Sequence, residues 1–242
     1  MSTFTVIRSA DRDHWRDSAV ISRQSFPATG SFDLEANAFG LLMVHNDDIV
    51  SPGEGFDMHF HKDVEIVSWI VDGAVRHRDS GSDDITVVRA GMAQHISAGS
   101  GVRHSEVNDA GYTSRQTARI VQSWLPADAA GTTPSHKAHD FNEVLADSAG
   151  FVQVAGPDSP LPLGTAGASM WVARLDGEGS ADGAVAGLPG ATFVHLYVIR
   201  GAVDVARHEL SEGDVLRGTD VGELVVHGTG EVLVWLMDRG IV

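Results

Sequence analysis

The sequence predicts an all-β protein made of two similar β units. Short runs rich in β-branched and aromatic residues end at glycines, as in Glu65–Asp72 and Phe193–Arg200. That pattern is typical of a strand followed by a turn. Glycine makes up 27 of the 242 residues, and no convincing long helical stretch interrupts the short runs. Many closely spaced turns between short strands favour barrels or sandwiches.

Other runs of the same kind predict further strands. In chain order they are Ala38–His45, Thr86–Arg89, Arg119–Leu125, Met170–Leu175, Glu223–Val226 and Val232–Met237. The best helical stretch, Asp140–Ala146, is short. Gly177–Gly190 (GEGSADGAVAGLPG) is rich in glycine and other small residues, so we expect an exposed loop there.

A weak internal repeat divides the chain in two. Trp69–Asp79 (WIVDGAVRHRD) resembles Tyr197–Arg207 (YVIRGAVDVAR), and a second glycine turn follows each copy. Two copies of one β unit are therefore expected. Pro126–His139 lies between them and is rich in proline, threonine and small residues, which are typical of a linker. We accordingly expect an N-terminal unit over residues 1–130 and a C-terminal unit over residues 140–242.

The composition excludes several classes of function. Lys plus Arg is 17 and Asp plus Glu is 33, and the formal net charge of −16 disfavours direct binding to nucleic acid. The lack of cysteine rules out disulfides, thiolate metal sites and cysteine nucleophiles. The opening segment MSTFTVIRSADRDHW has no apolar core, and no run nears the roughly 18 apolar residues of a membrane span. We expect a soluble, cytoplasmic protein without a membrane partner.

Two pairs of residues have the spacing of metal ligands. His59 and His61 are two positions apart, as are His104 and Glu106. Side chains at i and i+2 of a strand share a face, so each pair points into one space. Three imidazoles and one carboxylate suit Fe(II), Mn, Co, Ni, Cu(II) or Zn and leave positions for water or substrate. Taken alone, the histidine pair is as easily two satisfied core residues, and Glu106 a solvated charge at a strand edge.

The wider spacing resembles the two cupin motifs. Gly53 precedes His59 by five intervening residues, as in the first motif, and Gly91 opens a segment that is similar to the second. Two departures stand out: Ser97 replaces the proline of many cupins, and two extra residues precede His104. Glu65 also lies one position short of the usual glutamate ligand. The missing carboxylate is most economically supplied by Glu106.

These departures point to one family within the cupins. The segments GFDMHFHKDVEIVSWIVDGAVRHRDS and AGMAQHISAGSGVRHSEVN resemble the pirin family, with similarity strongest from Phe32 to about Pro126. The resemblance implies a bicupin, meaning two jelly-roll (double-stranded β-helix) barrels. It also implies one mononuclear metal, usually iron, in the N-terminal barrel. The ligands it implies are His59, His61, His104 and Glu106. Phe60 stands where the family usually has proline.

The C-terminal half carries histidines without this spacing. His195, His208 and His227 form no HxH or HxE pair, so we expect a C-terminal barrel without a metal. We expect His14, His136 and His139 at the surface and assign His77 no ligand role. His45 is expected near a domain face.

The resemblance leaves two functions open. Some pirins act as quercetin 2,3-dioxygenases, which implies a flavonol substrate, O2 and an iron centre, with Ni, Mn, Co, Cu or Zn as alternatives. Glu106 would then be a ligand, or would swing off and take the substrate proton as a catalytic base. Other pirins are transcriptional co-regulators, which implies a metal-responsive binding protein with a protein partner and no turnover. By position, we expect the substrate wall to contain Phe56, Met58, Phe60, Met92 and Ile96.

Overall fold

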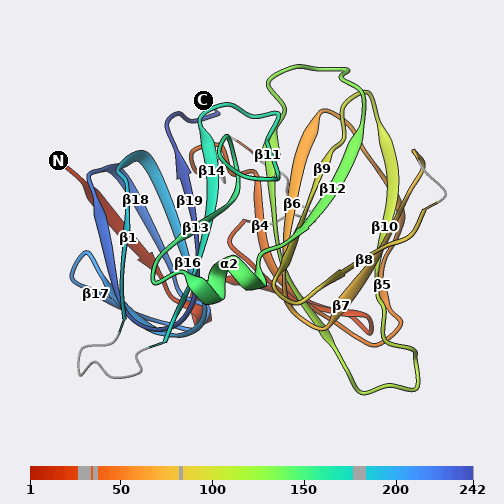
Figure 1. The fold of residues 1–242 in the computed structure, drawn as a ribbon, viewed down its shortest axis with the longest axis horizontal. Coiled ribbons are helices and arrows are strands. Elements are labelled where there is room, and N and C mark those ends of the chain that lie inside the picture. Colours follow the sequence, from red (N-terminus) through yellow and green to blue (C-terminus); the bar gives the residue numbers. More distant parts are fainter. Residues whose placement is uncertain (27–33, 35–37, 82–83, 177–183, 242) are drawn as a thin grey trace.

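The computed structural model confirms the predicted fold class, with two jelly-roll units side by side (Figure 1). It describes residues 1–26, 34, 38–81, 84–176 and 184–241. No helix among these residues is long and apolar enough to cross a membrane. Both units consist of antiparallel strands, and the one described α-helix of more than a single residue, α2 (Asn142–Asp147), lies close to the helical stretch predicted from the sequence.

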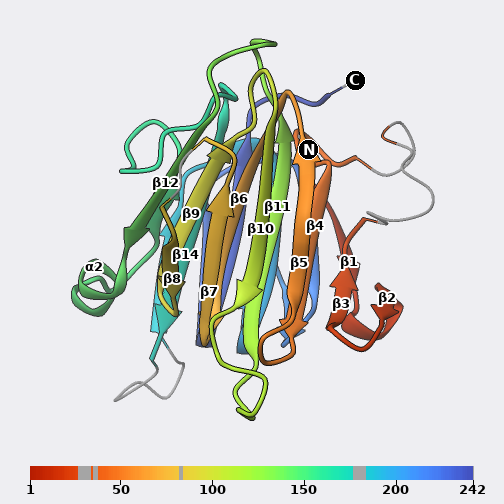
Figure 2. The same ribbon diagram turned by 90° about the vertical axis from the view of Figure 1, so that its right-hand side faces the viewer.

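The first unit has two facing sheets. Seven strands pair in the order β12-β9-β6-β11-β4-β3-β2, and four pair in the order β5-β10-β7-β8. Figure 2 looks onto this unit from the side of the four-stranded sheet. The strands of the unit are β2 (Asp13–Arg16), β3 (Val20–Gln24), β4 (Val44–Val50), β5 (Gly55–His61), β6 (Val64–Asp72), β7 (Ala74–Asp79), β8 (Thr86–Arg89), β9 (Met92–Ser97), β10 (Val102–Asn108), β11 (Ala118–Pro126) and β12 (Ser135–Asp140).

The second unit is one sheet that bends on itself. Its central order is β1-β18-β16-β19-β14-β13, with β15 beside β19 and β17 beside β16. Its strands are β1 (Thr3–Ile7), β13 (Val152–Ala155), β14 (Ala168–Leu175), β15 (Ala184–Leu188), β16 (Ala191–Val205), β17 (His208–Ser211), β18 (Val215–Val221) and β19 (Leu224–Met237). The two longest strands pair with each other, and their register shifts between Val198 and Arg200.

The internal repeat is visible in the backbone. Gly73 follows β6 with φ +70°, and Gly201 takes φ +83° at the matching point of the second copy. A Cβ on Gly73 would lie 2.7 Å from the carbonyl oxygen of Thr117, so both the positive φ and the close approach require glycine. The later turns match as well, with Gly91 at φ +78° and Gly213 at φ +86°.

A shared hydrophobic core joins the two units. One buried cluster includes Trp69 and Leu125 of the first unit together with Tyr197, Leu233 and Trp235 of the second. Polar contacts accompany it, because the Trp235 indole donates a 3.0 Å hydrogen bond to the Ser123 hydroxyl. One face of the seven-stranded sheet thus packs against the second unit, and its other face lines the interior of the first barrel.

Three local predictions are wrong. The predicted linker Pro126–His139 contains most of β12, which pairs with β9 over Ser135–Asp140. The predicted loop Gly177–Gly190 contains β15, which pairs with β19, while residues 177–183 lie outside the described residues. The predicted strand Ala38–His45 is mostly a turn, and the strand begins at Val44. In the first two cases pairing with a distant strand overrode a local composition signal.

The predicted division at residues 1–130 and 140–242 stays a prediction. Strand pairing crosses the two halves at the N-terminus, where β1 pairs with β18 of the second sheet. Glu223–Val226 and Val232–Met237 were predicted as two strands, but from Leu224 onward both belong to the single strand β19. His45 lies where the units meet, as expected, with its ring 4.5 Å from that of His195.

Candidate metal centre

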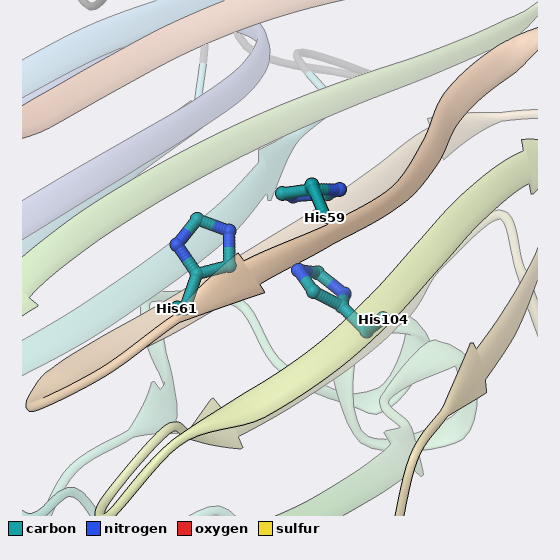
Figure 3. Close-up of side chains that lie close together, drawn as sticks. All are labelled: His59, His61 and His104. Carbon is teal, nitrogen blue, oxygen red and sulfur yellow. The ribbon is translucent and has the colours of Figure 1, made fainter.

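Three histidines converge inside the first barrel. Strands β5 and β10 pair with His59 opposite His104, and His61 lies two positions further along β5. The ring centroids of His104 lie 4.4 Å from His59 and 5.0 Å from His61. One nitrogen from each ring lies within 4.8 Å of the other two. Figure 3 shows the three rings gathered around one space, two from β5 and one from β10.

A β-bulge in β5 aims His59. Between His104 and Glu106 the β10 chain advances two residues, while its partners on β5 run three residues, from His59 to Phe56. A bulge of this kind re-aims a side chain next to a site. It places His59 and Phe56 on the same side although they are three positions apart. The His59 ring is fixed by a 2.6 Å hydrogen bond from its Nδ1 to the carbonyl oxygen of Asp57 in the bulge, which leaves Nε2 free.

The facing nitrogens have no partner in the protein. Nε2 of His61 and both ring nitrogens of His104 are buried without a hydrogen bond. Burial, followed by the nearby His104 and His59 rings, lowers the pKa of His61 to about 4. Burial, followed by the His59 and His77 rings, lowers the pKa of His104 to about 3. Both rings are therefore neutral near pH 7, the form that donates a lone pair to a metal ion.

Glu106 lies beside the three histidines and is set slightly back from them. Its Oε2 is 4.0 Å from Nδ1 of His104, and the side chain is buried. Hydrogen-bond donors surround the carboxylate: Gln94 donates a short hydrogen bond to Oε1, and Gln122 donates one of 2.9 Å to Oε2. The Ser68 hydroxyl lies 3.5 Å from Oε1. All four residues predicted as ligands thus meet at one end of the barrel, three as a tight cluster and the carboxylate next to it.

A cavity of about 280 Å³ opens onto this cluster. His59 and Glu106 lie on its wall, together with the aromatic side chains of Trp15, Phe56 and Trp124. Its other lining residues are Val20, Ser22, Gln24, Asn46, Asp48 and Gln122. The Trp124 ring also contacts His61 edge-on, with centroids 4.8 Å apart. The arrangement gives a largely apolar space next to three nitrogen donors.

The predicted substrate wall is only partly right. Phe56 lines the cavity, but Met58 and Phe60 point outward and are 46% and 56% exposed. Strand alternation explains the error, because Phe60 lies between two inward histidines. Ile96 lines a different cavity, and Met92 is not among the residues that line this one.

Trp124, Gln122 and Gln94 were missed by the sequence reasoning. The alternation of Gln122 and Trp124 within the predicted strand Arg119–Leu125 was a usable signal, since both belong to one face. The partners of Gln94 could not be inferred without the register of β9.

A second histidine cluster lies next to His104, with the His77 ring centroid 5.4 Å from that of His104. His77, Asp79 and His136 approach within 4.8 Å through their ligand atoms and line a cavity of about 330 Å³. His136, predicted at the surface, is half-buried there because β12 joins the sheet. Its ring stacks on His77, with centroids 3.8 Å apart and planes at 17°. Lone pairs in two nearly parallel ring planes do not meet at one point, so this stack is a poor metal cage.

Glu65 serves a different purpose from the usual cupin glutamate. Its Oε2 contacts Nε2 of His95 at 2.6 Å, and its Oε1 accepts a 2.7 Å hydrogen bond from Ser97. The amide of Gly164 also donates to Oε2, at 2.9 Å. Glu65 and His95 therefore bind the first unit to a loop of the second, away from the three-histidine cluster.

Known proteins match this chain over nearly all or part of its length. The family model named Pirin matches residues 8–125. A Mycobacterium bovis protein named "Putative quercetin 2,3-dioxygenase" is 38% identical over 98% of this chain and 96% of its own. The quercetin 2,3-dioxygenase of Escherichia coli K12 is 34% identical over 57% of this chain and 58% of its own. A crystal structure of a bacterial pirin from Escherichia coli in complex with nickel(II) matches with a TM-score of 0.85 and 27% identity, over 98% of this chain and all of that one.

Proposed function

This chain belongs to the pirin family, and on that basis we propose that it is a metal-dependent dioxygenase acting on a flavonol such as quercetin. The proposed ligands of its single metal ion are His59, His61, His104 and Glu106. The observation that carries the proposal is that two features adjoin. Three imidazoles cluster, two of them (His61 and His104) with buried nitrogens that have no partner, and an aromatic cavity is lined by the third, His59.

The residues present fit a divalent metal ion. Buried polar atoms normally have hydrogen-bond partners, so the orphaned nitrogens of His61 and His104 need one from outside the protein. An ion satisfies both rings at once, and His59 offers its free Nε2. The Glu106 carboxylate supplies a compensating negative charge in the same buried region.

We infer iron(II) as the native ion, with nickel(II) as the first alternative. Three imidazoles and one carboxylate suit several first-row metals, and geometry alone seldom separates them. The nickel(II) complex of the Escherichia coli pirin supports this proposal, because a protein of the same fold binds a divalent transition metal.

The cavity suits a flat aromatic substrate. Trp15, Phe56 and Trp124 offer ring faces and edges, which pack well against another aromatic system. Asn46 lies on the same wall, and its buried Oδ1, which has no partner in the protein, offers a hydrogen bond to a substrate hydroxyl group. When bound, the ion acts as a Lewis acid that favours the deprotonated hydroxyl of the substrate. The chain's own part is to orient the ring plane toward the three histidines and to exclude water from them.

Metal analysis combined with an oxygen electrode tests the proposal. The chain is stripped with a chelator, reloaded separately with Fe(II), Mn(II), Co(II), Ni(II) or Cu(II), and mixed with quercetin. We expect one ion per chain and oxygen uptake that disappears on chelation. A chain that binds one ion but consumes no oxygen with any of the five metals would overturn the dioxygenase and favour the metal-responsive regulatory protein.

A further inference from the structure

The orientation of Glu106 depends on two glutamines. Gln122 donates from Nε2 to Oε2 of the carboxylate, and Gln94 donates from Nε2 to Oε1. An amide group can present either its NH2 or its oxygen to a neighbour. The oxygen would repel the carboxylate, so whatever fixes the two amides also fixes Glu106.

Trp124 fixes the first amide. Its indole Nε1 donates a 2.8 Å hydrogen bond to Oε1 of Gln122, and an indole N–H can only donate. The amide oxygen of Gln122 must therefore face Trp124, and its NH2 must face Glu106. The same NH2 also donates to the Ser68 hydroxyl at 3.1 Å.

His136 fixes the second amide. Its Nε2 lies 3.0 Å from Oε1 of Gln94, an atom that can only accept. Burial, followed by the nearby His77 ring, lowers the pKa of His136 to about 3, so the ring is neutral and carries one proton. That proton must sit on Nε2. Gln94 is fully buried, so solvent offers its amide no substitute donor.

His136 is itself positioned by His77. Its ring stacks on His77, and Nε2 of His77 contacts Oδ2 of Asp79 at 3.1 Å. Both histidines line the 330 Å³ cavity, which shares no lining residue with the aromatic cavity. A row of contacts thus runs from Asp79 through His77, His136 and Gln94 to Glu106.

The geometry points to His136 and Gln94 as positioning residues that hold Glu106 in place for the metal ion. This inference rests on the proposed function, because it takes Glu106 as a ligand. Three donors, from Gln94, Gln122 and Ser68, already contact its two oxygens. Glu106 is therefore a fixed ligand, and a swing away from the ion to act as a catalytic base would break these hydrogen bonds.

Co(II) binding to the full-length chain tests the assignment without any turnover. His136→Phe keeps a ring to stack on His77 but removes the donor to Gln94, and Gln94→Met removes the donor to Glu106. Loss of such supporting contacts commonly weakens metal binding by about 10- to 100-fold. We expect both variants to bind Co(II) about 10-fold more weakly, with a changed visible absorption spectrum. His136→Gln, which restores a donor of similar reach, should recover affinity to within about 3-fold of the parent.

His139→Phe is the matched control. His139 lies on the same strand β12 but is exposed, and its ring contacts Phe141. It should bind Co(II) as the parent does. Parent-like affinity and spectrum in folded His136→Phe, or an equal loss in His139→Phe, would overturn the positioning role while leaving the metal centre intact. A parent chain that binds no Co(II) would instead overturn the proposed function itself.

Discussion

Arg119 on β11 donates two hydrogen bonds to the buried carboxylate of Asp47 on β4, from Nε to Oδ1 at 2.9 Å and from Nη2 to Oδ2 at 2.8 Å. The same Nη2 donates to the carbonyl oxygen of Ile199 in the second unit, and the Tyr197 hydroxyl donates to Asp47. One ion pair therefore ties the seven-stranded sheet to the neighbouring unit, on the face opposite the metal centre.

Arg119→Met should destabilise the chain strongly. Removal of one partner from a buried pair leaves the other charge uncompensated, at a cost of about 3–5 kcal/mol. Arg23 lies 3.0 Å from Asp47 and still offers partial compensation, so we expect a loss of about 3 kcal/mol. Urea unfolding at pH 7 measures it. Arg16→Met, at an exposed position of β2, should change stability by less than about 0.5 kcal/mol.

The cost of Arg119→Met should shrink in acid. Burial alone would raise the pKa of Asp47, but the hydrogen bond and charge of Arg119 outweigh it and hold that pKa below the usual value of 3.8. The stabilisation is then fully present above about pH 4 and is lost as the pH falls through the lowered pKa. Unfolding of parent and variant at pH 7 and pH 3 should show a smaller difference at pH 3. An unchanged difference would contradict the assignment to Asp47.

Strand alternation accounts for how the predicted ligands come together, while their role as metal ligands stays a prediction. His59 with His61, and His104 with Glu106, need only a period of two to share a face, and the register of β5 with β10 then brings the pairs together. The same rule, applied to Met58 and Phe60, would have placed both outside. They were assigned to the wall through their nearness in sequence, which does not determine the face.

Other features depend on pairing between distant segments. Nothing in Ser135–Asp140 distinguishes an edge strand from a linker, yet its pairing with β9 brings His136 to Gln94. The β5 bulge likewise puts Phe56 beside His59 against simple alternation. Such contacts follow from tertiary register, which a local pattern does not contain.

Glu106→Gln should empty the metal centre while preserving its shape. Glutamine is nearly isosteric, but it lacks the charge, and its NH2 would face the donor of either Gln94 or Gln122. We expect Co(II) affinity to fall by about 100-fold or more, since even supporting residues are worth 10- to 100-fold. Competition with a chelator measures it. Glu54→Gln, at an exposed position before β5, should bind the ion normally.

Phe56→Ala and Phe60→Ala make the same change on one strand with opposite orientations. Phe56 lines the aromatic cavity, whereas Phe60 is 56% exposed. Loss of an aromatic contact of about 0.5–1.5 kcal/mol predicts quercetin binding weaker by roughly 3- to 10-fold for Phe56→Ala. Phe60→Ala should leave quercetin affinity unchanged in a fluorescence titration. Equal effects of the two substitutions would show that quercetin binds elsewhere.

Asp48 should make stability fall as the pH rises from about 4 to 7. Burial, together with the Asp47 and Glu106 carboxylates, raises its pKa to about 7 from the usual value of 3.8. In this window the folded state keeps a proton that the unfolded chain has released, so rising pH favours unfolding.

Asp48→Asn isolates this effect, because asparagine fills the same space and does not titrate. At about 1.4 kcal/mol per pKa unit, the raised pKa of Asp48 lowers the free energy of unfolding by on the order of 4 kcal/mol between about pH 4 and pH 7. Urea unfolding at pH 5 and pH 8, with a chelator present to remove any ion, should show a flatter pH dependence for Asp48→Asn than for the parent. Asp13→Asn, at an exposed position of β2, should follow the parent curve. If Asp48→Asn also followed the parent curve, the Asp48 carboxyl would already be ionised at pH 5. Any fall in the parent's stability with pH would then have to come from another titratable group of the cavity wall.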